Sequence, residues 1–365
     1  MYDLLDVYRR TLERCGPDRL IARVAESGMP RDVVAIGKCA GLLFDGFART
    51  AGVRDALVAI PEGYRRPGSG AEVVTGGHPD ITAASFAAGK RVLEFVDAHD
   101  DVTFLISGGG SACVEQPLAP WFTEDDLSAL SRRLVASGLT IGEINCVRKH
   151  VSAIKGGRLG ARVRGRGVTL IYSDVSDGAF ADVASGPTLP DKTTKEEAKR
   201  LAGIRFDEDV PETVKQLANM RVVLVADNST LTATAAELIG AGAVPWGSQL
   251  EGDVEVEAAA LLERAQGLQP GQVLVAGGEP TVIQRGHGRG GRCTELAVRF
   301  ALRAAGGPWQ ALFASSDGVD GSSGAAGVML RGIHSFDEGS ARDCLARVAY
   351  KMPFKCRFVP RRPNI

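Results

Sequence analysis

Short apolar runs alternate with amphipathic stretches along most of this chain, and this alternation restricts the available folds more than any other feature. Five apolar runs have the length of buried strands: residues 33–36, 56–60, 102–106, 168–172 and 222–225. Helical patterns fall between and around them, at residues 3–15, 38–48, 83–96, 125–137, 141–155, 192–202, 211–218 and 228–238. Repeated strand–loop–helix units predict an α/β fold with a Rossmann-like, doubly wound and mainly parallel sheet.

The last third of the chain follows a different pattern. Residues 272–276 and 281–284 are expected strands joined only by Gly-Gly-Glu-Pro, and so short a connection predicts antiparallel neighbours. A helix at 295–304 and a strand at 311–314 follow. We therefore expect two α/β domains, the larger at residues 1–250 and a smaller one with a mixed sheet at residues 251–365.

Composition argues against several classes of partner. The formal net charge is −1 and the pI is about 6.6, so neither nucleic acid nor an anionic membrane is expected as a partner. No apolar stretch approaches the ~20 residues that span a bilayer. The seven cysteines are widely spaced and form no C-x-x-C pair, which is typical of reduced thiols in the cytoplasm and argues against a zinc site. We expect a cytoplasmic protein with small-molecule substrates, and the sequence leaves a homodimer open.

The loop after the expected strand at 102–106 is the clearest candidate site. It reads Ser107-Gly-Gly-Gly-Ser111, and consecutive glycines allow backbone N–H groups to approach a phosphate closely. The alternative is a tight turn that needs one or two glycines. Lys38 opens a helix after another strand, where a cation is unfavourable unless an anion lies nearby. The alternative for this residue is a solvated lysine.

Polar residues also gather in the middle of the chain. The run 145–157 contains Arg148 and Lys155 and ends in two glycines, which suits an anionic substrate. Asp174 and Asp177 follow the next expected strand. Mg²⁺ binds proteins through one or two carboxylates together with phosphate oxygens, although Asp-Gly pairs are also ordinary turn residues. Clusters of this kind at strand ends are typical of ligand sites in open α/β sheets.

Two loops of the smaller domain carry further candidates. The run 286–291 matches G-x-G-x-x-G, but it does not follow the first strand of a βαβ unit, so it is a weak dinucleotide fingerprint. We interpret it as a flexible loop that brings Arg292 to phosphate, because arginine binds phosphate bidentately; a mobile surface loop is the alternative. Asp317 and Asp320 lie past the strand at 311–314 and are candidates for Mg²⁺.

Seven motifs occur in one order along the chain: Gly77-His78-Pro79, Ser107-Gly-Gly-Gly-Ser111, the run 145–157, Ser173-Asp174, Ala184-Ser185-Gly-Pro-Thr188, Gly277-Gly-Glu279 and Asp317-Gly-Val-Asp320. In this order they resemble the glycerate 2-kinase family of the MOFRL type, whose members are often labelled hydroxypyruvate reductases. The resemblance covers about residues 33 to 327. It implies two α/β domains and phosphorylation of glycerate at its 2-hydroxyl to 2-phosphoglycerate, with ATP and Mg²⁺.

The resemblance and the chemistry of the loops together give the expected site. Lys38, Arg292 and Asp317 match family positions that are expected at the reacting centre. ATP is expected to contact His78, Ser107, Gly108, Gly109, Gly110, Ser111, Lys155, Gly156 and Glu279. The substrate is expected at Arg148, Ser185 and Arg292, and Mg²⁺ at Asp174 and Asp317.

The chain departs from the family pattern in two places. Cys293 stands where the family usually has asparagine after Gly-Gly-Arg, and a thiol does not reproduce the donors and acceptor of an amide. From residue 335 on, the expected Thr-Gly-Pro-Thr-Gly-Thr-Asn stretch and final strand give way to a basic tail with Pro353, Pro360 and Pro363. Because proline is excluded from central strands, we expect a poorly packed tail and a second domain that is incomplete at its end.

Two other functions stay open at this point. A hydroxypyruvate reductase would need a dinucleotide-binding loop, and the G-x-G-x-x-G run of this chain is out of place for one. A non-catalytic nucleotide-binding remnant would bind ATP without turnover, as expected if the altered terminus abolishes activity. Binding of NADH and turnover of ATP separate these two alternatives from the kinase.

Overall fold

The computed structural model describes residues 2–175, 178–203, 206–207, 209–283, 289–304 and 309–332, together with the backbone of residues 357–360. The chain forms two compact units. The first holds Gly16–Asp227, and the second holds Met1–Cys15 together with Asn228–Ile365. The observed division thus differs from the expected boundary at 250/251. No helix in the described part of the chain is both long and apolar enough to cross a bilayer.

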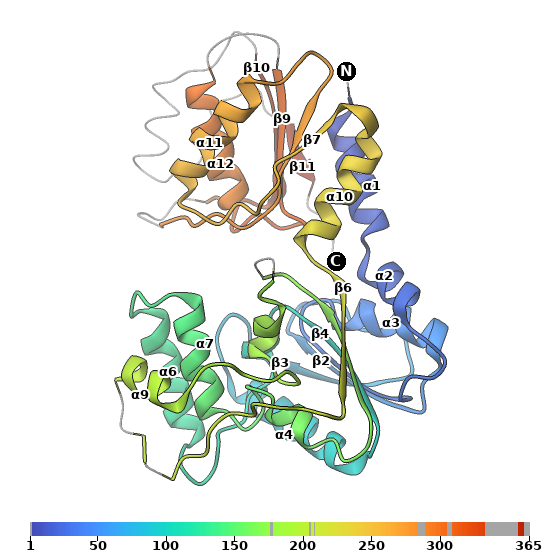
Figure 1. The fold of residues 1–365 in the computed structure, drawn as a ribbon, viewed down its shortest axis with the longest axis vertical. Helices are drawn as coiled ribbons and strands as arrows, with labels where there is room; N and C mark the ends of the chain where they lie inside the picture. Colours follow the sequence, from blue (N-terminus) through green and yellow to red (C-terminus); the bar gives the residue numbers. More distant parts are fainter. Residues whose placement is uncertain are drawn as a thin grey trace. The chain divides into compact units, whose positions relative to one another are not determined.

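A six-stranded parallel sheet forms the centre of the first unit (Figure 1). Its strands lie in the order β3-β2-β1-β4-β5-β6, which confirms the expected doubly wound, Rossmann-like sheet. The strand β3 escaped prediction because it is a partly exposed edge strand with only two β-branched apolar residues. The bounds are β1 (Asp32–Ile36), β2 (Asp55–Pro61), β3 (Glu72–Gly76), β4 (Val102–Ser107), β5 (Gly167–Tyr172) and β6 (Met220–Ala226).

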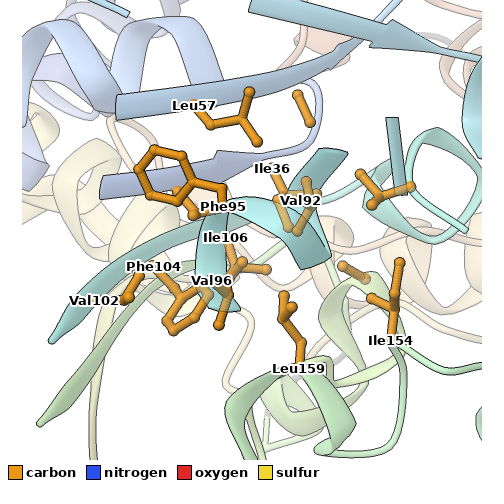
Figure 2. Close-up of a cluster of buried hydrophobic side chains, with 14 of the residues drawn as sticks. Ile36, Leu57, Val92, Phe95, Val96, Val102, Phe104, Ile106, Ile154 and Leu159 are labelled. Atoms are coloured by element: carbon orange, nitrogen blue, oxygen red, sulfur yellow. The ribbon is translucent and has the colours of Figure 1, made fainter. Parts of the chain in front are cut away.

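Successive side chains of the central strands enter two cores on opposite faces of the sheet, as the pleat requires. Ile36 and Ile106 belong to one core, where Phe95 of α4 packs with them (Figure 2). Their neighbours Ala35 and Leu105 belong to the other core, which α2 and α3 cover. Helices therefore lie on both faces, at α2 (Pro17–Val24), α3 (Ala40–Ala51), α4 (Ala83–Ala98), α5 (Gly110–Cys113) and α8 (Arg158–Ala161).

Three more helices of this unit share an apolar core of their own. They are grouped together in Figure 1 and comprise α6 (Glu124–Val135), α7 (Ile141–Val151) and α9 (Lys195–Ala202). Each begins at a threonine whose hydroxyl accepts a backbone N–H while an acid three residues on binds back, in a capping box. These signals explain why the starts of α6 and α7 agree closely with the prediction.

The expected helix at 211–218 is wrong. The Asp191 N–H donates to the Val214 carbonyl at 2.8 Å, and the Val214 N–H donates to the Gly156 carbonyl at 3.0 Å. Backbone groups that a helix would pair internally are therefore bound to distant segments. Local periodicity predicted the helix because it contains no information about these tertiary bonds.

The second unit combines an antiparallel sheet, in the order β11-β10-β9, with a parallel pair, β7 and β8 (Figure 1). Both strand directions are present, as expected for a mixed arrangement. The expected antiparallel pairing of 272–276 with 281–284 is wrong, because β8 pairs with β7, and Thr281 forms an isolated parallel bridge with Asp253. The bounds are β7 (Ala243–Pro245), β8 (Val273–Val275), β9 (Trp309–Ala314), β10 (Ala325–Gly332), β11 (Arg357–Pro360), α10 (Asn228–Ile239), α11 (Val254–Gln266) and α12 (Arg292–Arg303).

The N-terminal helix α1 (Leu4–Arg14) packs within the second unit and not with the sheet that follows it in sequence. Leu5 is buried in a cluster with Met329 of β10. The Tyr8 hydroxyl donates to the Ser315 carbonyl at 2.8 Å, and α1 also packs along α10. These contacts explain why residues 1–15 join the later part of the chain.

The end of the chain contributes one strand to this unit. The strand β11 pairs antiparallel with β10, with Val359 opposite Gly327, and forms an edge of the sheet. Pro360 is its last residue, a position where a missing N–H is tolerated. Residues 357–360 thus pair as a strand, whereas poor packing of the tail stays a prediction, and the other residues after 332 lie outside the described part.

Candidate functional site

The strand order of the first unit reverses between β1 and β4, and the loops that follow these two strands are bonded to each other. The Lys38 N–H donates to the Gly108 carbonyl at 2.8 Å, and the Cys39 N–H donates to the Ser107 hydroxyl oxygen at 3.1 Å. Open α/β sheets bind ligands at the carboxyl ends of strands where the order reverses. The structure thus brings together two of the loops that the sequence predicts to bind phosphate.

Two glycines allow functional side chains to lie directly against the backbone of the loop. A Cβ atom on Gly108 would lie 1.5 Å from Asp174 Oδ2, and one on Gly109 would lie 2.7 Å from Lys38 Cγ. The same Cβ on Gly109 would be 3.3 Å from His78 Cδ2. Gly109 also has a φ of +80°, which favours glycine. The expected residues Lys38, His78 and Asp174 therefore surround this loop.

Lys38 gives the loop its positive charge. Within the described residues its ammonium has no hydrogen-bond or ion-pair partner. The His78 ring keeps access to solvent, but neighbouring atoms remove part of its hydration, and this loss together with the Lys38 charge lowers the pKa of His78. At neutral pH the imidazole is therefore uncharged, and it offers a hydrogen bond beside the cation.

Asp174 follows β5 and lies beside Gly108. A carboxylate this close to a phosphate-binding backbone would repel a phosphate unless a cation lay between them. Mg²⁺ is such a cation, because it is held by one or two carboxylates together with phosphate oxygens. No group of three or more His, Cys, Asp or Glu side chains placed to hold a metal occurs within the described ranges. Asp177, the other acid expected here, lies outside those ranges.

A chain of hydroxyl groups joins the glycine loop to α7. The Ser111 and Ser185 hydroxyl oxygens are 2.8 Å apart, and the Ser185 hydroxyl donates to Asn145 Oδ1 at 3.1 Å. Ser185 is fully buried and has a φ of +60°, a conformation that is uncommon for a residue other than glycine and concentrates at functional sites. The Gly156 N–H donates to the Ser185 carbonyl at 3.1 Å. The expected residues Ser111, Ser185 and Gly156 thus lie together.

The prediction places Lys155 at ATP, whereas the structure places its ammonium inside the first unit. The side chain is 1% exposed and forms an ion pair with Glu115, which is 2% exposed. Glu115 also accepts a hydrogen bond from the Ser152 hydroxyl at 2.5 Å. Burial lowers the pKa of Lys155, and the Glu115 charge opposes this shift. Lys155 therefore neutralises a buried carboxylate in this structure, and its contact with ATP stays a prediction.

Arg148, also on α7, has no such partner. It is half-buried, its Nε is inaccessible, and its guanidinium makes no hydrogen bond or ion pair with any residue that the structure describes. Burial lowers the pKa of Arg148, and the charge of Glu115 acts in the opposite direction. A buried charge without a partner is costly. Arg148 is therefore a candidate for binding an anionic group.

The two residues after Arg148 have structural partners instead. Lys149 Nζ lies 3.1 Å from Asp191 Oδ1, and both side chains are buried. His150 Nε2 lies 2.7 Å from Glu212 Oε1. Of the three consecutive basic residues on α7, only Arg148 is thus left for a ligand.

The predicted site residues of the second unit lie on its loops. Arg292 begins α12 and forms an ion pair with Glu279 at 2.7 Å, and both side chains are more than half exposed. Asp317 Oδ1 accepts hydrogen bonds from the Ser315 hydroxyl at 2.5 Å and the Val319 N–H at 2.9 Å. Arg292 and Glu279 are therefore in contact, and Asp317 lies in an exposed turn.

Asp320 holds the start of α12. Its two carboxylate oxygens accept the N–H groups of Cys293 at 2.9 Å and Thr294 at 3.0 Å, and the residue is 3% exposed. A carboxylate at a helix N-terminus is stabilised by the helix dipole, so Asp320 caps α12. Burial and the charge of Asp320 raise the pKa of the Cys293 thiol, which is therefore no nucleophile.

Two hollows in the described part of the first unit lie away from these loops. One of about 370 Å³ is lined by residues 165–167 and 218–221, at the amino ends of β5 and β6. Another of about 270 Å³ is lined by residues of α9 together with Phe206 and Asp207. Neither contains a predicted site residue, so the geometry of the loops identifies the site and cavity volume does not.

Sequence reasoning missed Glu115. It ends the otherwise apolar stretch Ala112-Cys-Val-Glu115, and a charge at the end of a buried run was the available signal. Its partners Ser152 and Lys155 are 37 and 40 residues away. Spacing along the chain therefore did not reveal the pairing.

Two protein-family models match the chain. A domain of unknown function (DUF4147) matches residues 3–219, which is more than half of the chain. The MOFRL family matches residues 272–347.

Similar proteins agree with these matches. A glycerate 2-kinase from Sulfurisphaera tokodaii is 33% identical over 318 residues, which cover 82% of this chain and 78% of the relative. A D-glycerate 2-kinase from Thermotoga maritima is 32% identical over 356 residues, covering 90% of this chain and 85% of the relative. The crystal structure of glycerate kinase from Thermotoga maritima has a TM-score of 0.79 at 30% identity, covering 94% of this chain and 88% of that chain. The chain belongs to the family of glycerate 2-kinases that combine the DUF4147 and MOFRL regions.

Proposed function

We propose that this protein transfers a phosphoryl group from ATP to the 2-hydroxyl of glycerate, giving 2-phosphoglycerate. The observation that carries the proposal is the bonding of the β1 loop to the β4 loop, with Lys38 against the glycine-rich backbone. Phosphoryl transfer needs cations and backbone donors around the transferring oxygens. These loops supply both, in a chain whose relatives are named glycerate kinases.

The phosphates of ATP are proposed to lie on the backbone of Ser107–Ser111. Lys38, whose stem lies against Gly109, would stabilise the negative charge that develops on the transferring group. His78, neutral at physiological pH, would add a hydrogen bond without a second charge. This arrangement gives each of the predicted ATP contacts in these loops a physical role.

We assign Asp174 to Mg²⁺ because its carboxylate lies beside Gly108, where the phosphates are proposed to bind. Asp317 of the second unit is the other candidate, since both of its described hydrogen bonds use Oδ1. When bound, Mg²⁺ neutralises charge on the phosphate oxygens. Chelation with EDTA should therefore abolish turnover, and added Mg²⁺ should restore it.

Arg148 and Ser185 are proposed to bind glycerate, whose carboxylate matches the planar guanidinium bidentately. Arg292 is proposed to bind phosphate or substrate oxygens. Its exposed ion pair with Glu279 is worth only about 0–1 kcal/mol. Arg292 can therefore exchange Glu279 for a ligand at little cost.

The test measures ADP release by the purified full-length protein with ATP, Mg²⁺ and D-glycerate. ADP formation that depends on glycerate, with a product that enolase consumes directly, supports phosphorylation at the 2-hydroxyl. Absence of glycerate-dependent ADP release contradicts the proposal. Oxidation of NADH in the presence of hydroxypyruvate would support the reductase, and ATP binding without turnover would support the non-catalytic remnant.

The first unit gives the reductase no dinucleotide loop. The turn after β1 reads Gly37-Lys-Cys39, which lacks the G-x-G-x-x-G of the dinucleotide-binding fold.

We also propose a cytoplasmic location, supported by the absence of disulfides among the described cysteines. A homodimer stays a prediction, to be tested by light scattering.

A further inference from the structure

We propose that Glu115 is a positioning residue for Arg148, holding its guanidinium where it takes the carboxylate of the acceptor. In this proposal Lys155 is the buried counter-ion that fixes Glu115. The inference rests on the proposed phosphorylation of glycerate and deepens it, because it assigns a residue that acts on the acceptor and not on ATP.

One face of α7 carries the residues that argue for this role. Asn145, Arg148 and Ser152 follow one another at i, i+3 and i+7, and this spacing places them on the same side of a helix. The first of them binds the hydroxyl of Ser185 at 3.1 Å, and the last binds Glu115 at 2.5 Å. Arg148 therefore lies on the part of α7 between these two bonded residues, four residues before Ser152.

Among the residues that the structure describes, the charges of Glu115, Lys155 and Arg148 do not balance. Glu115 Oε2 pairs with Lys155, and Oε1 accepts hydrogen bonds from the Ser152 hydroxyl and, at 3.0 Å, the Gln116 N–H. Both carboxylate oxygens are therefore engaged, so Glu115 acts on Arg148 through Ser152 at the end of α7 and not through an ion pair. One carboxylate and two cations leave one positive charge, on Arg148. An anionic ligand completes the group.

The geometry favours a small carboxylate as that anion. The guanidinium is planar and binds a carboxylate through two parallel hydrogen bonds, so its direction matters as much as its charge. Arg148 is carried by a helix whose end is fixed through Ser152, the C-cap residue of α7. Displacement of a positioned group by about 1 Å costs an enzyme much of its rate. Loss of Glu115 should therefore weaken binding of the acceptor and leave binding of ATP unchanged.

The first measurement is calorimetric binding of D-glycerate, and separately of ATP, to the full-length wild type and to Glu115→Gln. We expect the dissociation constant of glycerate to rise about tenfold, which corresponds to the free energy of one hydrogen bond to a charged group. The dissociation constant of ATP should stay within about twofold. In turnover, KM for glycerate should rise more than kcat falls.

A matched control separates positioning from stability. Asp191→Asn breaks the buried pair with Lys149 on the same helix, so it should lower the melting temperature without changing glycerate affinity. The double variant Glu115→Gln/Lys155→Met removes both charges of the Glu115 pair. Because replacing a whole buried pair costs far less than removing one partner, its stability should recover while glycerate binding stays weak. If Glu115→Gln does not fold, the glycerate affinity of the double variant provides the test.

Each outcome decides a different statement. Recovery of glycerate affinity in the double variant, or equal loss in Asp191→Asn, overturns the positioning role. A wild type that binds glycerate but releases no ADP contradicts the proposed kinase, while its binding series still decides the role of Glu115. A wild type that does not bind glycerate overturns the inference as well. Glycerate affinity that survives Arg148→Met also overturns it, even where the kinase assay succeeds.

Discussion

At the scale of single residues, the loop Ser107–Ser111 depends on two glycines, whose lack of a side chain leaves room for neighbouring residues. Gly108 leaves room for the carboxylate of Asp174, and Gly109 leaves room for the stem of Lys38. A methyl group at either position would occupy space that a functional residue fills. The two glycines thus have different neighbours, and each can be tested separately.

Replacement of Gly109 by alanine tests this arrangement. The new Cβ would meet Lys38, so we expect weaker ATP binding and a lower kcat/KM, together with a loss of about 1–2 kcal/mol of stability from the left-handed backbone. Gly138→Ala is the control, because Gly138 has a φ of +76° with no neighbour within 4 Å. Urea unfolding should show a stability loss from the left-handed backbone in both variants, and calorimetry should show an ATP-binding defect in Gly109→Ala alone. Equal ATP affinities of Gly109→Ala and the wild type would contradict the proposed binding of phosphate by the backbone of Ser107–Ser111.

Removal of either proposed catalytic cation should slow the chemical step. Lys38→Ala and Arg292→Ala should each lower kcat by about 10²–10³, the effect of losing one preorganised electrostatic donor. Lys90→Ala, at an exposed position on α4, is the control and should have the wild-type kcat. Steady-state kinetics of ADP release measure all three. A kcat near that of the wild type would remove the residue from the reacting centre, whatever its KM.

Residues of the site were predictable where they are local to a strand end. Lys38 and Ser107–Ser111 could be placed because the strands before them are apolar and the glycines follow at once. Glu115 and the buried position of Lys155 could not be predicted, because their pairing spans 40 residues and depends on how α7 packs. The roles of Arg292 and Asp317 came from a family resemblance and remain predictions.

At the scale of elements, Glu212 ties α7 to α9. Its carboxylate accepts the N–H of Lys195 at the start of α9, at 2.9 Å, and binds His150 of α7. Burial raises the pKa of Glu212, but its bonds to the backbone of Lys195 and Thr213 and to His150 outweigh burial and lower it to about 2. The ionised form of Glu212 therefore holds the two helices together.

This pKa gives an acid-sensitivity prediction. A carboxylate with a folded pKa of about 2 and an ordinary value of 4.5 stabilises the fold above pH 4.5, and the contribution is lost as pH falls toward 2. The effect should be modest because the side chain is 40% exposed. Glu212→Gln should lower the urea midpoint at pH 7 and flatten its fall below pH 4.5, and Glu62→Gln, an exposed control, should do neither. If the urea midpoints of Glu212→Gln and the wild type fall in parallel as pH falls, the proposed stabilising role of Glu212 between α7 and α9 is contradicted.

Elements with strong local signals were predicted, and elements defined by tertiary contacts were not. The strands β1, β2, β4, β5 and β6 are apolar enough to be recognised from sequence, and they fixed the expectation of a doubly wound sheet. The partly exposed β3 and the helical pattern at 211–218 misled prediction. The pairing of β8 with β7 was also missed. The short Gly-containing connection predicted a pairing with residues 281–284, because it contains no information about a distant strand.

At the scale of the whole molecule, one compact unit combines two separate parts of the chain. The helix α1 belongs with β9, β10 and α10, and Leu5 is buried among side chains of β9 and β10. The first unit, Gly16–Asp227, is one continuous segment between the two parts of the second unit. Damage to α1 should therefore act on a sheet that lies more than 300 residues away in sequence.

Leu5→Ala tests this connection. The buried leucine should cost about 2–5 kcal/mol, whereas Arg9→Ala, at an exposed position of the same helix, should stay within about ±0.5 kcal/mol. Hydrogen exchange should show lost protection in β9 and β10 and unchanged protection in β1 and β4. Lost protection confined to the first unit would contradict the assignment of α1.

The contact between α1 and the last strands has a consequence for synthesis on the ribosome. Tyr8 and its partner Ser315 are separated by 307 residues, and translation adds about 5–20 residues per second, so α1 waits roughly 15–60 s for its binding surface. During that time the parallel sheet can fold in the nascent chain while the apolar side of α1, including Leu5 and Leu12, stays uncovered. A nascent chain that carries such an uncovered helix is a natural client for a chaperone that binds short apolar segments near the ribosome exit.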